Sequence, residues 1–314
     1  MGEPTRIAVT VGEHGPLLAP VLQASVSDAE VIVSTVEAPV DDAEVIVSLL
    51  DNAARAQLEA TLTPAVDWVH VFAAGVDGFP FELLGDRVLT CSRGASAVAI
   101  AEFALTTMLA FEKRLPESWI GEPPAQWGQA GLGGLNGRTL VLVGLGAIGT
   151  EVARRALAFG MDVVAVRRTS TPAELDGVEV AGSLTEALAR ADHVVVAAAA
   201  TDATRHLLDA DAFDALRPGA HVVNVARGSL IDQHALVAAL DSGRVARASL
   251  DVTDPEPLPA GHALYAHPNV RLSPHISWSS PDTVRRTIEI FVENVTRWRQ
   301  RRALAGRVDP SIGY

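Results

Sequence analysis

Short apolar runs alternate with mixed polar segments along the whole chain. In the first third of the sequence the runs cover residues 7–11, 31–33, 45–49, 68–72 and 88–89. Apolar runs of this length indicate strands that are buried on both faces of a sheet, and the helical or turn segments between them are typical of parallel-strand connections. We therefore predict a small parallel-sheet α/β domain at the N-terminus.

A second series of apolar runs follows a helical stretch at 95–115 and a loop at 117–137. These runs predict a second, larger parallel sheet, with strands at 139–143, 162–166, 194–199, 222–225, 248–252 and 270–272. A helical segment at 283–302 has no strand of that sheet left to follow, so we expect it to return to the first domain. The predicted fold class is α/β, with two Rossmann-like or flavodoxin-like parallel-sheet domains, 1–97 plus 286–314 and 98–285, and a cleft between them.

The run at 139–143 ends at Gly144-Leu145-Gly146-Ala147-Ile148-Gly149 and continues as a predicted helix. In such a junction the first glycine allows a tight turn, the second lets a ligand approach the backbone, and the third lets helix and strand pack closely. The helix N-terminus also offers free N–H groups and partial positive charge to a pyrophosphate. The run at 162–166 completes a strand–helix–strand unit, which favours a dinucleotide site over a purely structural turn.

The residues after 162–166 bear on which dinucleotide is bound. Folds that hold NAD place Asp or Glu there, roughly 20 residues past the turn, on the ribose hydroxyls, whereas this chain has Arg167-Arg168-Thr169. An acid would repel a ribose 2′-phosphate, but a guanidinium binds it through two charge-assisted hydrogen bonds. We therefore predict that NADP(H) is preferred. NAD remains the alternative if the arginines are only solvated residues at a strand end.

Three polar side chains follow further predicted strands and should gather at the edge of the glycine turn. Arg227 can bind a carboxylate with both prongs of its guanidinium, and Glu256 lies between two prolines that keep it out of a helix. His275 is the natural acid–base residue, because hydride delivery to a carbonyl leaves an alkoxide that needs a proton. Glu256 would fix the tautomer of His275. Taken singly, these residues have structural alternatives: an interdomain salt bridge, a surface acid and a capped loop histidine.

Composition narrows the class of partner. The 314-residue chain has a formal net charge of −13, which disfavours nucleic acid and anionic membranes. Lys113 is the only lysine, so Schiff-base chemistry elsewhere is excluded. The histidines show no metal-ligand spacing. Cys91 stands alone, no run of about 18 apolar residues occurs, and the N-terminus lacks a signal-peptide pattern, so we expect a cytoplasmic protein.

Over nearly its whole length the chain resembles the D-isomer-specific 2-hydroxyacid dehydrogenase family. The matching motifs are Gly144 to Gly149, Phe159-Gly160-Met161, Arg217-Pro218-Gly219, Asn224 to Gly228, Leu250-Asp251-Val252 with Glu256-Pro257, and Ser273-Pro274-His275. The resemblance implies reversible hydride transfer between a nicotinamide cofactor and a short 2-oxo acid such as glyoxylate or hydroxypyruvate. With NADP(H) the physiological direction would be reduction. Relatives pair as homodimers through the nucleotide domain, and the 117–137 loop could contribute to such pairing here.

The resemblance also implies roles for individual residues. Arg227 would bind the substrate carboxylate and carbonyl oxygen, His275 would donate the proton, and Glu256 would support His275. Asp251 matches the position that holds the nicotinamide carboxamide.

Ala74 and Gly75 match the family loop whose amides receive the substrate carboxylate. Two positions depart from the family pattern. Arg167 stands where most members have the ribose-binding Asp, and in this it resembles the NADP-linked glyoxylate and hydroxypyruvate reductases. Trp278 stands where smaller residues are frequent, and it either borders the substrate pocket, restricting the acyl side chain, or covers the sheet edge.

An alternative interpretation is that the protein is an NAD(P)H-sensing binding protein and not an enzyme. Transcriptional corepressors that resemble this family keep the Arg, Glu and His residues, so these residues do not exclude it. The sequence ends at Tyr314, just after the last predicted helix and without a tail for recruitment, which favours an enzyme. Within the enzymes, Glu256 disfavours formate dehydrogenases, which pair their histidine with Gln.

Overall fold

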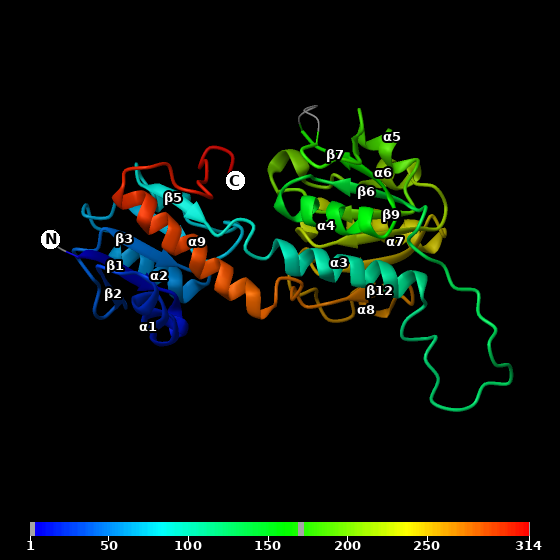
Figure 1. Cartoon of the computed structure of the whole chain (residues 1–314), viewed down its shortest axis with the longest axis horizontal. Helices are drawn as coiled ribbons and strands as arrows, with labels where there is room; N and C mark the ends of the chain where they lie inside the picture. The colour runs from blue at the N-terminus through cyan, green and yellow to red at the C-terminus, as the bar shows by residue number, and fades with distance from the viewer. Residues whose placement is uncertain (1–3, 169–172, 314) are drawn as a thin grey trace. The chain divides into compact units, whose positions relative to one another are not determined.

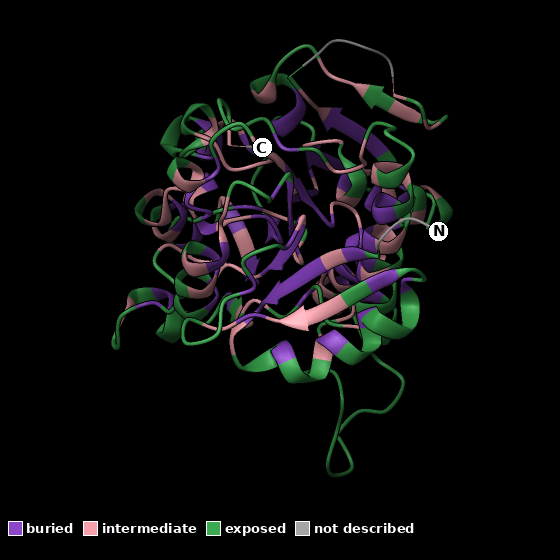
Figure 2. Ribbon diagram, turned by 90° about the vertical axis from the view of Figure 1, so that its left-hand side faces the viewer, coloured by how far each residue is buried: buried purple, intermediate pink, exposed green. Residues whose placement is uncertain are grey.

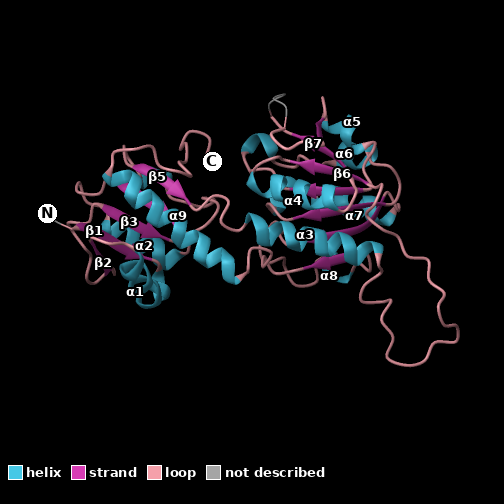
Figure 3. Ribbon diagram, viewed as in Figure 1, coloured by secondary structure: helices cyan, strands magenta, loops and turns pink. Residues whose placement is uncertain are grey.

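The computed structural model describes residues 4–168 and 173–313. The chain divides into two compact units, Met1–Ser96 with Ser280–Tyr314, and Ala97–Ser279. Each unit is built around a parallel sheet covered by helices (Figures 1 and 3). The predicted α/β class with two parallel-sheet domains is therefore confirmed.

The first unit contains a five-stranded parallel sheet with the strand order β2-β1-β3-β4-β5. Its strands are β1 (Thr5–Thr10), β2 (Ala29–Val33), β3 (Val45–Ser48), β4 (Trp68–Val71) and β5 (Val88–Cys91). Its helices are α1 (Gly15–Ser25), α2 (Asn52–Thr61) and α9 (Pro281–Arg299).

Helix α9 belongs to the first unit although it follows the second unit in the sequence. It begins after Ser280, whose side chain accepts a hydrogen bond from the Thr283 N–H, and Pro281 occupies its first turn. Its buried face carries Phe291, whose ring centroid lies 5.6 Å from that of the buried Trp68 on β4. The burial of these two aromatic rings fixes the helix against the first sheet.

The second unit contains a seven-stranded sheet with the order β12-β11-β10-β9-β6-β7-β8, in which all neighbouring strands are parallel. Its strands are β6 (Thr139–Val143), β7 (Asp162–Val166), β8 (Val178–Val180), β9 (His193–Val196), β10 (Ala220–Asn224), β11 (Val245–Leu250) and β12 (Val270–Leu272). Its helices are α3 (Ala97–Glu112), α4 (Ala147–Ala158), α5 (Leu184–Leu188), α6 (Ala210–Ala215), α7 (Gln233–Asp241) and α8 (Ala263–Ala266).

The second sheet is buried on both faces. Leu140 and Leu142 of β6 pack into a core with α3 and α4, whereas Val141 and Val143 pack into the core on the other face. This alternation explains the uninterrupted apolar run of the sequence. Figure 2 shows most strands largely in purple, as buried, and the outer faces of the helices largely in green, as exposed.

The order of the strands reverses at β6, which lies between β9 and β7. Open parallel sheets bind ligands at such a switch point, outside the carboxyl ends of the strands. The turn after β6 begins at Gly144, so the fold places the glycine motif at this position. Among the described residues, no helix has the length and apolar character that a membrane span requires.

His70 on β4 is a fully buried histidine in the first sheet. Its Nδ1 lies 2.7 Å from the Thr90 hydroxyl and its Nε2 lies 3.0 Å from the Ser92 hydroxyl. Burial disfavours the charged ring and lowers the pKa of His70 to about 3. The ring is therefore neutral in the folded protein at mildly acidic pH.

This burial predicts a measurable loss of stability in acid. The folded-state pKa is lower than the unfolded value of 6.5, so the unfolded chain binds more protons, and stability falls as the pH decreases below about 6.5. We expect His70 to account for about 2 kcal/mol of lost unfolding free energy between pH 7 and pH 5. In urea titrations, His70→Gln should lose less stability over this interval than the parent, while His14→Gln, at an exposed position, should match the parent. If His70→Gln lost as much unfolding free energy between pH 7 and pH 5 as the parent, this assignment would be contradicted.

Candidate active site

The three glycines of the turn after β6 meet three different steric needs. Gly144 has φ +103°, and a Cβ there would lie 2.6 Å from the Ala198 backbone nitrogen. A Cβ on Gly149 would lie 2.2 Å from the Gly144 carbonyl oxygen, because helix α4 packs closely on the strand end. A Cβ on Gly146 would meet nothing within 4 Å among the described residues. The backbone at Gly146 is thus open on the side where a ligand can approach.

The start of α4 has no side-chain cap. Helices α2, α5, α6, α7 and α9 each begin after an Asp or Ser whose side chain accepts a first-turn N–H, whereas Gly146 precedes α4 and provides no such acceptor. Ala147 and Ile148 form the first turn of α4. Amides at a helix start have no intrahelical acceptor and favour an anion. The open, uncapped turn fits the pyrophosphate of a dinucleotide.

Arg167 and Arg168 follow β7, which neighbours β6 in the sheet. Arg167 is half-buried and Arg168 is exposed. Within residues 4–168 and 173–313, neither side chain makes a hydrogen bond or an ion pair, whereas Arg155 on α4 binds Glu151. Both guanidinium groups are therefore available to an external anion as far as the described residues show. Thr169, the third predicted residue of this group, lies outside them.

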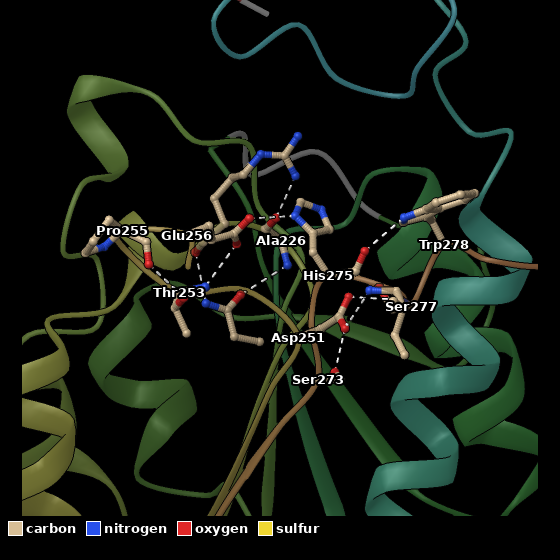
Figure 4. A network of polar contacts seen from close by, with 12 residues as sticks. Ala226, Asp251, Thr253, Pro255, Glu256, Ser273, His275, Ser277 and Trp278 are labelled. Atoms are coloured by element: carbon tan, nitrogen blue, oxygen red, sulfur yellow. Dashed lines mark hydrogen bonds and ion pairs between the residues drawn. The ribbon is translucent and has the colours of Figure 1, made fainter. Parts of the chain in front are cut away.

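His275 lies in the loop after β12, and its backbone adopts a left-handed conformation with φ 53°. Its Nδ1 lies 2.8 Å from Oε2 of Glu256 (Figure 4). The other carboxylate oxygen of Glu256 accepts a hydrogen bond from the Thr253 N–H at 3.0 Å. Glu256 thus orients the ring from the Nδ1 side. The opposite nitrogen, Nε2, has no hydrogen-bond partner among the described residues, so it can address a reacting oxygen.

Asp251 fixes the loop that carries His275. Its carboxylate is buried and accepts hydrogen bonds from the Ser273 hydroxyl at 2.5 Å and from the N–H groups of Ile276 and Ser277, each at 2.9 Å. Its backbone carbonyl accepts from the His275 N–H at 2.9 Å. The family resemblance implies that Asp251 contacts the nicotinamide carboxamide, whereas its hydrogen bonds to this loop emerge only in the structure.

Removing the Asp251 carboxylate should destabilise the second unit. Asp251→Ala leaves two backbone N–H groups and a hydroxyl without their acceptor, so we expect a loss of about 3 kcal/mol in unfolding free energy. Asp214→Ala, at an exposed position on α6, is the matched control and should change stability by less than about 0.5 kcal/mol. Urea unfolding of the two variants measures the difference, and equal stabilities would show that this network contributes little.

Arg227 lies beyond the carboxyl end of β10 in a loop that is held at two points. The Asn224 side-chain amide donates to the Arg227 carbonyl at 2.9 Å and accepts from the Ala226 N–H at 3.1 Å. A Cβ on Gly228 would lie 1.9 Å from the Thr253 carbonyl carbon, so the Arg227 loop packs directly against the loop of Glu256. The half-buried Arg227 side chain donates to the Ala226 carbonyl at 2.7 Å. Asn224 is thus a positioning residue, a role that was not predicted from the sequence.

The remaining predicted residues lie in both units. Ala74 and Gly75 follow β4 in the first unit, where the Cys91 thiol lies 3.5 Å from the Ala74 carbonyl oxygen. Trp278 belongs to the second unit and is 45% exposed, and its indole N–H donates to the His275 carbonyl at 2.9 Å (Figure 4). The described residues contain no cluster of His, Cys, Asp or Glu suited to a metal ion.

A parallel sheet with an open glycine turn at its switch point, and with a histidine–carboxylate pair at the same edge, defines a dinucleotide-binding oxidoreductase. Comparison with known families supports this class. Residues 105–277 match the family model described as "D-isomer specific 2-hydroxyacid dehydrogenase, NAD binding domain". The chain belongs to the D-isomer-specific 2-hydroxyacid dehydrogenase family, whose members act on a CH–OH group.

Individual relatives agree with this assignment. The chain is 35% identical to 4-methyl-2-oxopentanoate reductase A of Aspergillus oryzae over 246 residues, which cover 77% of this chain and 74% of the relative. It is 32% identical to a glyoxylate reductase of Korarchaeum cryptofilum over 260 residues, which cover 79% and 76%. A family member of known structure from Xanthobacter autotrophicus, solved in complex with NADPH and MES, matches with a TM-score of 0.86 and 28% identity, covering all of both chains.

Proposed function

We propose that this protein is an NADPH-preferring D-2-hydroxyacid dehydrogenase that reduces a short 2-oxo acid. The single observation that carries the proposal is the 2.8 Å contact between His275 Nδ1 and Glu256, because it leaves Nε2 to deliver a proton. The contact lies in the unit that carries the uncapped glycine turn. Chiral analysis of the product formed from NADPH and hydroxypyruvate tests the proposal. We expect only the D-enantiomer, and an L or racemic product would contradict it.

The chain's own residues account for the steps around hydride transfer. A nicotinamide cofactor, when bound, would supply the hydride that the carbonyl carbon of the acid receives. Arg227 binds the substrate carboxylate and carbonyl oxygen and stabilises the negative charge that develops on that oxygen. His275 passes the Nε2 proton to the same oxygen, while Glu256 stabilises the ring from Nδ1. The amides of Ala74 and Gly75 receive the other end of the carboxylate.

The glycine turn holds the pyrophosphate of the cofactor, and Arg167 and Arg168 bind the ribose 2′-phosphate, with Thr169 beside them. The support for this assignment is that neither arginine has a partner among the described residues. Asp251 remains the residue that we propose for the nicotinamide carboxamide. Its carboxylate oxygens can accept a further hydrogen bond besides those from the His275 loop.

The cofactor assignment predicts an asymmetric effect of substitution. Replacing Arg167→Asp together with Arg168→Ser should raise the KM for NADPH at least about tenfold, since charge-assisted contacts to the 2′-phosphate are lost. The KM for NADH should change far less, because NADH lacks that phosphate. Steady-state kinetics with both cofactors measures the two values, with Arg154→Gln on α4 as the control. An equal effect on the two cofactors would rule out the 2′-phosphate contact.

The substrate that we propose is a short 2-oxo acid, such as glyoxylate or hydroxypyruvate. Trp278 carries a large side chain beside His275, to which its indole is hydrogen-bonded. A bulky residue at this position leaves little room for a long acyl chain. The named relatives include reductases of both a short and a branched acid, so substrates of different size occur within the family.

We also propose that the protein works as a homodimer in the cytoplasm. The segment between α3 and β6 extends away from the rest of the second unit (Figure 1) and exposes Trp119, Ile120 and Trp127 by 73%, 56% and 79%. Such side chains are unfavourable in water and favour an interface with a second copy. The buried, unpaired Cys91 thiol fits a reducing compartment.

A further inference from the structure

A cavity of about 610 Å³ lies at the amino edge of the second sheet, opposite the edge that carries Gly144 and His275. Residues near the starts of β6, β9, β10, β11 and β12 line it, together with the last turn of α3 and the segment that follows that helix. Its volume is in the range of small-molecule sites. None of the residues assigned to the proposed reaction lines it.

Arginines and acidic residues converge on this cavity from distant parts of the sequence. The charged lining consists of Arg114, Arg138, Arg247, Arg271, Glu112, Glu117 and Asp192. Two of the carboxylates are already occupied by other partners. Asp192 binds Arg138 at 2.9 Å, and Glu112 lies 3.1 Å from Nε2 of the buried His193. Only Glu117 remains to neutralise the other three arginines.

Arg247 is the least satisfied of these arginines. Its side chain is 15% exposed and makes no hydrogen bond within the described residues, although its guanidinium lies over the Phe111 ring. Its closest carboxylate oxygen, on Glu117, is 3.9 Å away and is held by Arg271 at 2.6 Å. Burial and the nearby charge of Arg271 both lower the pKa of Arg247. A largely buried guanidinium normally has acceptors for its five N–H groups.

Arg114 adds a further positive group at the end of α3. Its side chain is exposed and has no ion-pair partner in the part of the chain that the structure describes. Glu117 thus acts as an internal anion between Arg247 and Arg271, so one carboxylate serves these two guanidinium groups, and Arg114 has no carboxylate partner among the described residues. Added oxyanion groups would satisfy donors that the protein itself leaves unpaired.

We propose that this cavity is a second ligand site, which binds a small anion with two or more oxyanion groups between Arg247, Arg271 and Arg114. The chemistry suits either a phosphorylated metabolite or a polycarboxylate, because a guanidinium fork binds phosphate and carboxylate alike. The proposal does not depend on the proposed function. The site is also separate from the reaction: Arg247 and Arg271 lie on β11 and β12, whereas Asp251 and His275 follow the carboxyl ends of these two strands.

Calorimetric titration of the whole protein tests the site, with inorganic pyrophosphate and citrate as the two probes and with NADPH present to occupy the glycine turn. We expect one probe to bind per chain. Arg271→Gln and Arg247→Gln should each weaken binding about tenfold or more, because each removes charge-assisted hydrogen bonds. Tighter binding of pyrophosphate would identify a phosphorylated ligand, and tighter binding of citrate would identify a polycarboxylate.

A substitution that strengthens binding of the probe shows that weaker binding in the arginine variants is not caused by misfolding. Glu117→Gln removes the internal competitor and should strengthen binding by up to about fivefold, whereas Glu122→Gln, in the same exposed segment, should leave it unchanged. Circular dichroism verifies the fold of each variant, and the exposed Arg114→Gln provides a third test if Arg247→Gln unfolds. No binding of either probe up to about 10 mM, or binding that is equal in Arg271→Gln and the parent, would overturn the proposal.

Discussion

Replacing His275 by Ala is expected to lower kcat for 2-oxo acid reduction by about 10²- to 10⁴-fold. The imidazole is the group that can place a proton on the new alkoxide, since its Nε2 is available while Nδ1 is held by Glu256 at 2.8 Å. Water would have to supply the proton in the variant, without the same orientation. The dissociation constant of NADPH should change little, because the cofactor contacts that we propose lie elsewhere on the second unit.

Glu256→Gln tests the same proton donor with a milder substitution. Its amide can still accept a hydrogen bond from His275, but it no longer stabilises a positive ring, so kcat should fall less than in His275→Ala. His234→Gln, in the first turn of α7, is the matched control and should retain full activity. Stopped-flow or steady-state rates and fluorescence titration of NADPH give both quantities. Full turnover in His275→Ala would show that another residue is the acid.

Arg227→Gln should lower kcat/KM for the 2-oxo acid by about 10²-fold or more. The guanidinium is the only group that we assign to both the carboxylate and the carbonyl oxygen, and each charge-assisted contact contributes about 1.5–3 kcal/mol. Arg227→Lys keeps the charge but not the fork, so it should recover only part of the loss. The effect should appear in KM and in kcat, because the carbonyl oxygen gains charge in the transition state.

Arg205→Gln is the control for Arg227. Arg205 is also an arginine of the second unit, where it pairs with Asp254 at 3.4 Å, two residues before Glu256. If only the charge near the loops mattered, both substitutions would impair turnover alike. A selective loss in Arg227→Gln identifies a direct contact with the substrate, and equal kinetics of Arg227→Gln and the parent would remove Arg227 from the mechanism.

Much of the fold could be predicted from the sequence because both sheets are parallel and buried. Their strands are uninterrupted apolar runs, which are visible without knowledge of the partners. Strand β8 was not predicted, since Val178–Val180 is a three-residue edge strand with one polar residue and no apolar run. The strand at 194–199 was predicted too long: β9 ends at Val196, because the following alanines form the loop that closes over Gly144.

The candidate site was predictable to the extent that its chemistry follows strand ends. Glu256 and His275 are 19 residues apart in sequence, and the structure brings them to 2.8 Å. The supporting hydrogen bonds were not predictable, because they depend on the exact path of loops. Asn224 and Asp251 illustrate this limit: both are buried polar residues at the end of a strand, and in the sequence only their position at the end of an apolar run could have marked them as loop anchors.

Initial rates of NADPH and NADH oxidation test the proposed reaction, with glyoxylate, hydroxypyruvate, pyruvate, 2-oxobutyrate, phenylpyruvate and 2-oxoisocaproate as substrates. We expect turnover that is faster with NADPH than with NADH, and faster with the short acids than with the long or aromatic ones. Tight cofactor binding without turnover of any acid would contradict the proposed reaction, and would identify the protein as a nicotinamide-nucleotide sensor that keeps the family fold.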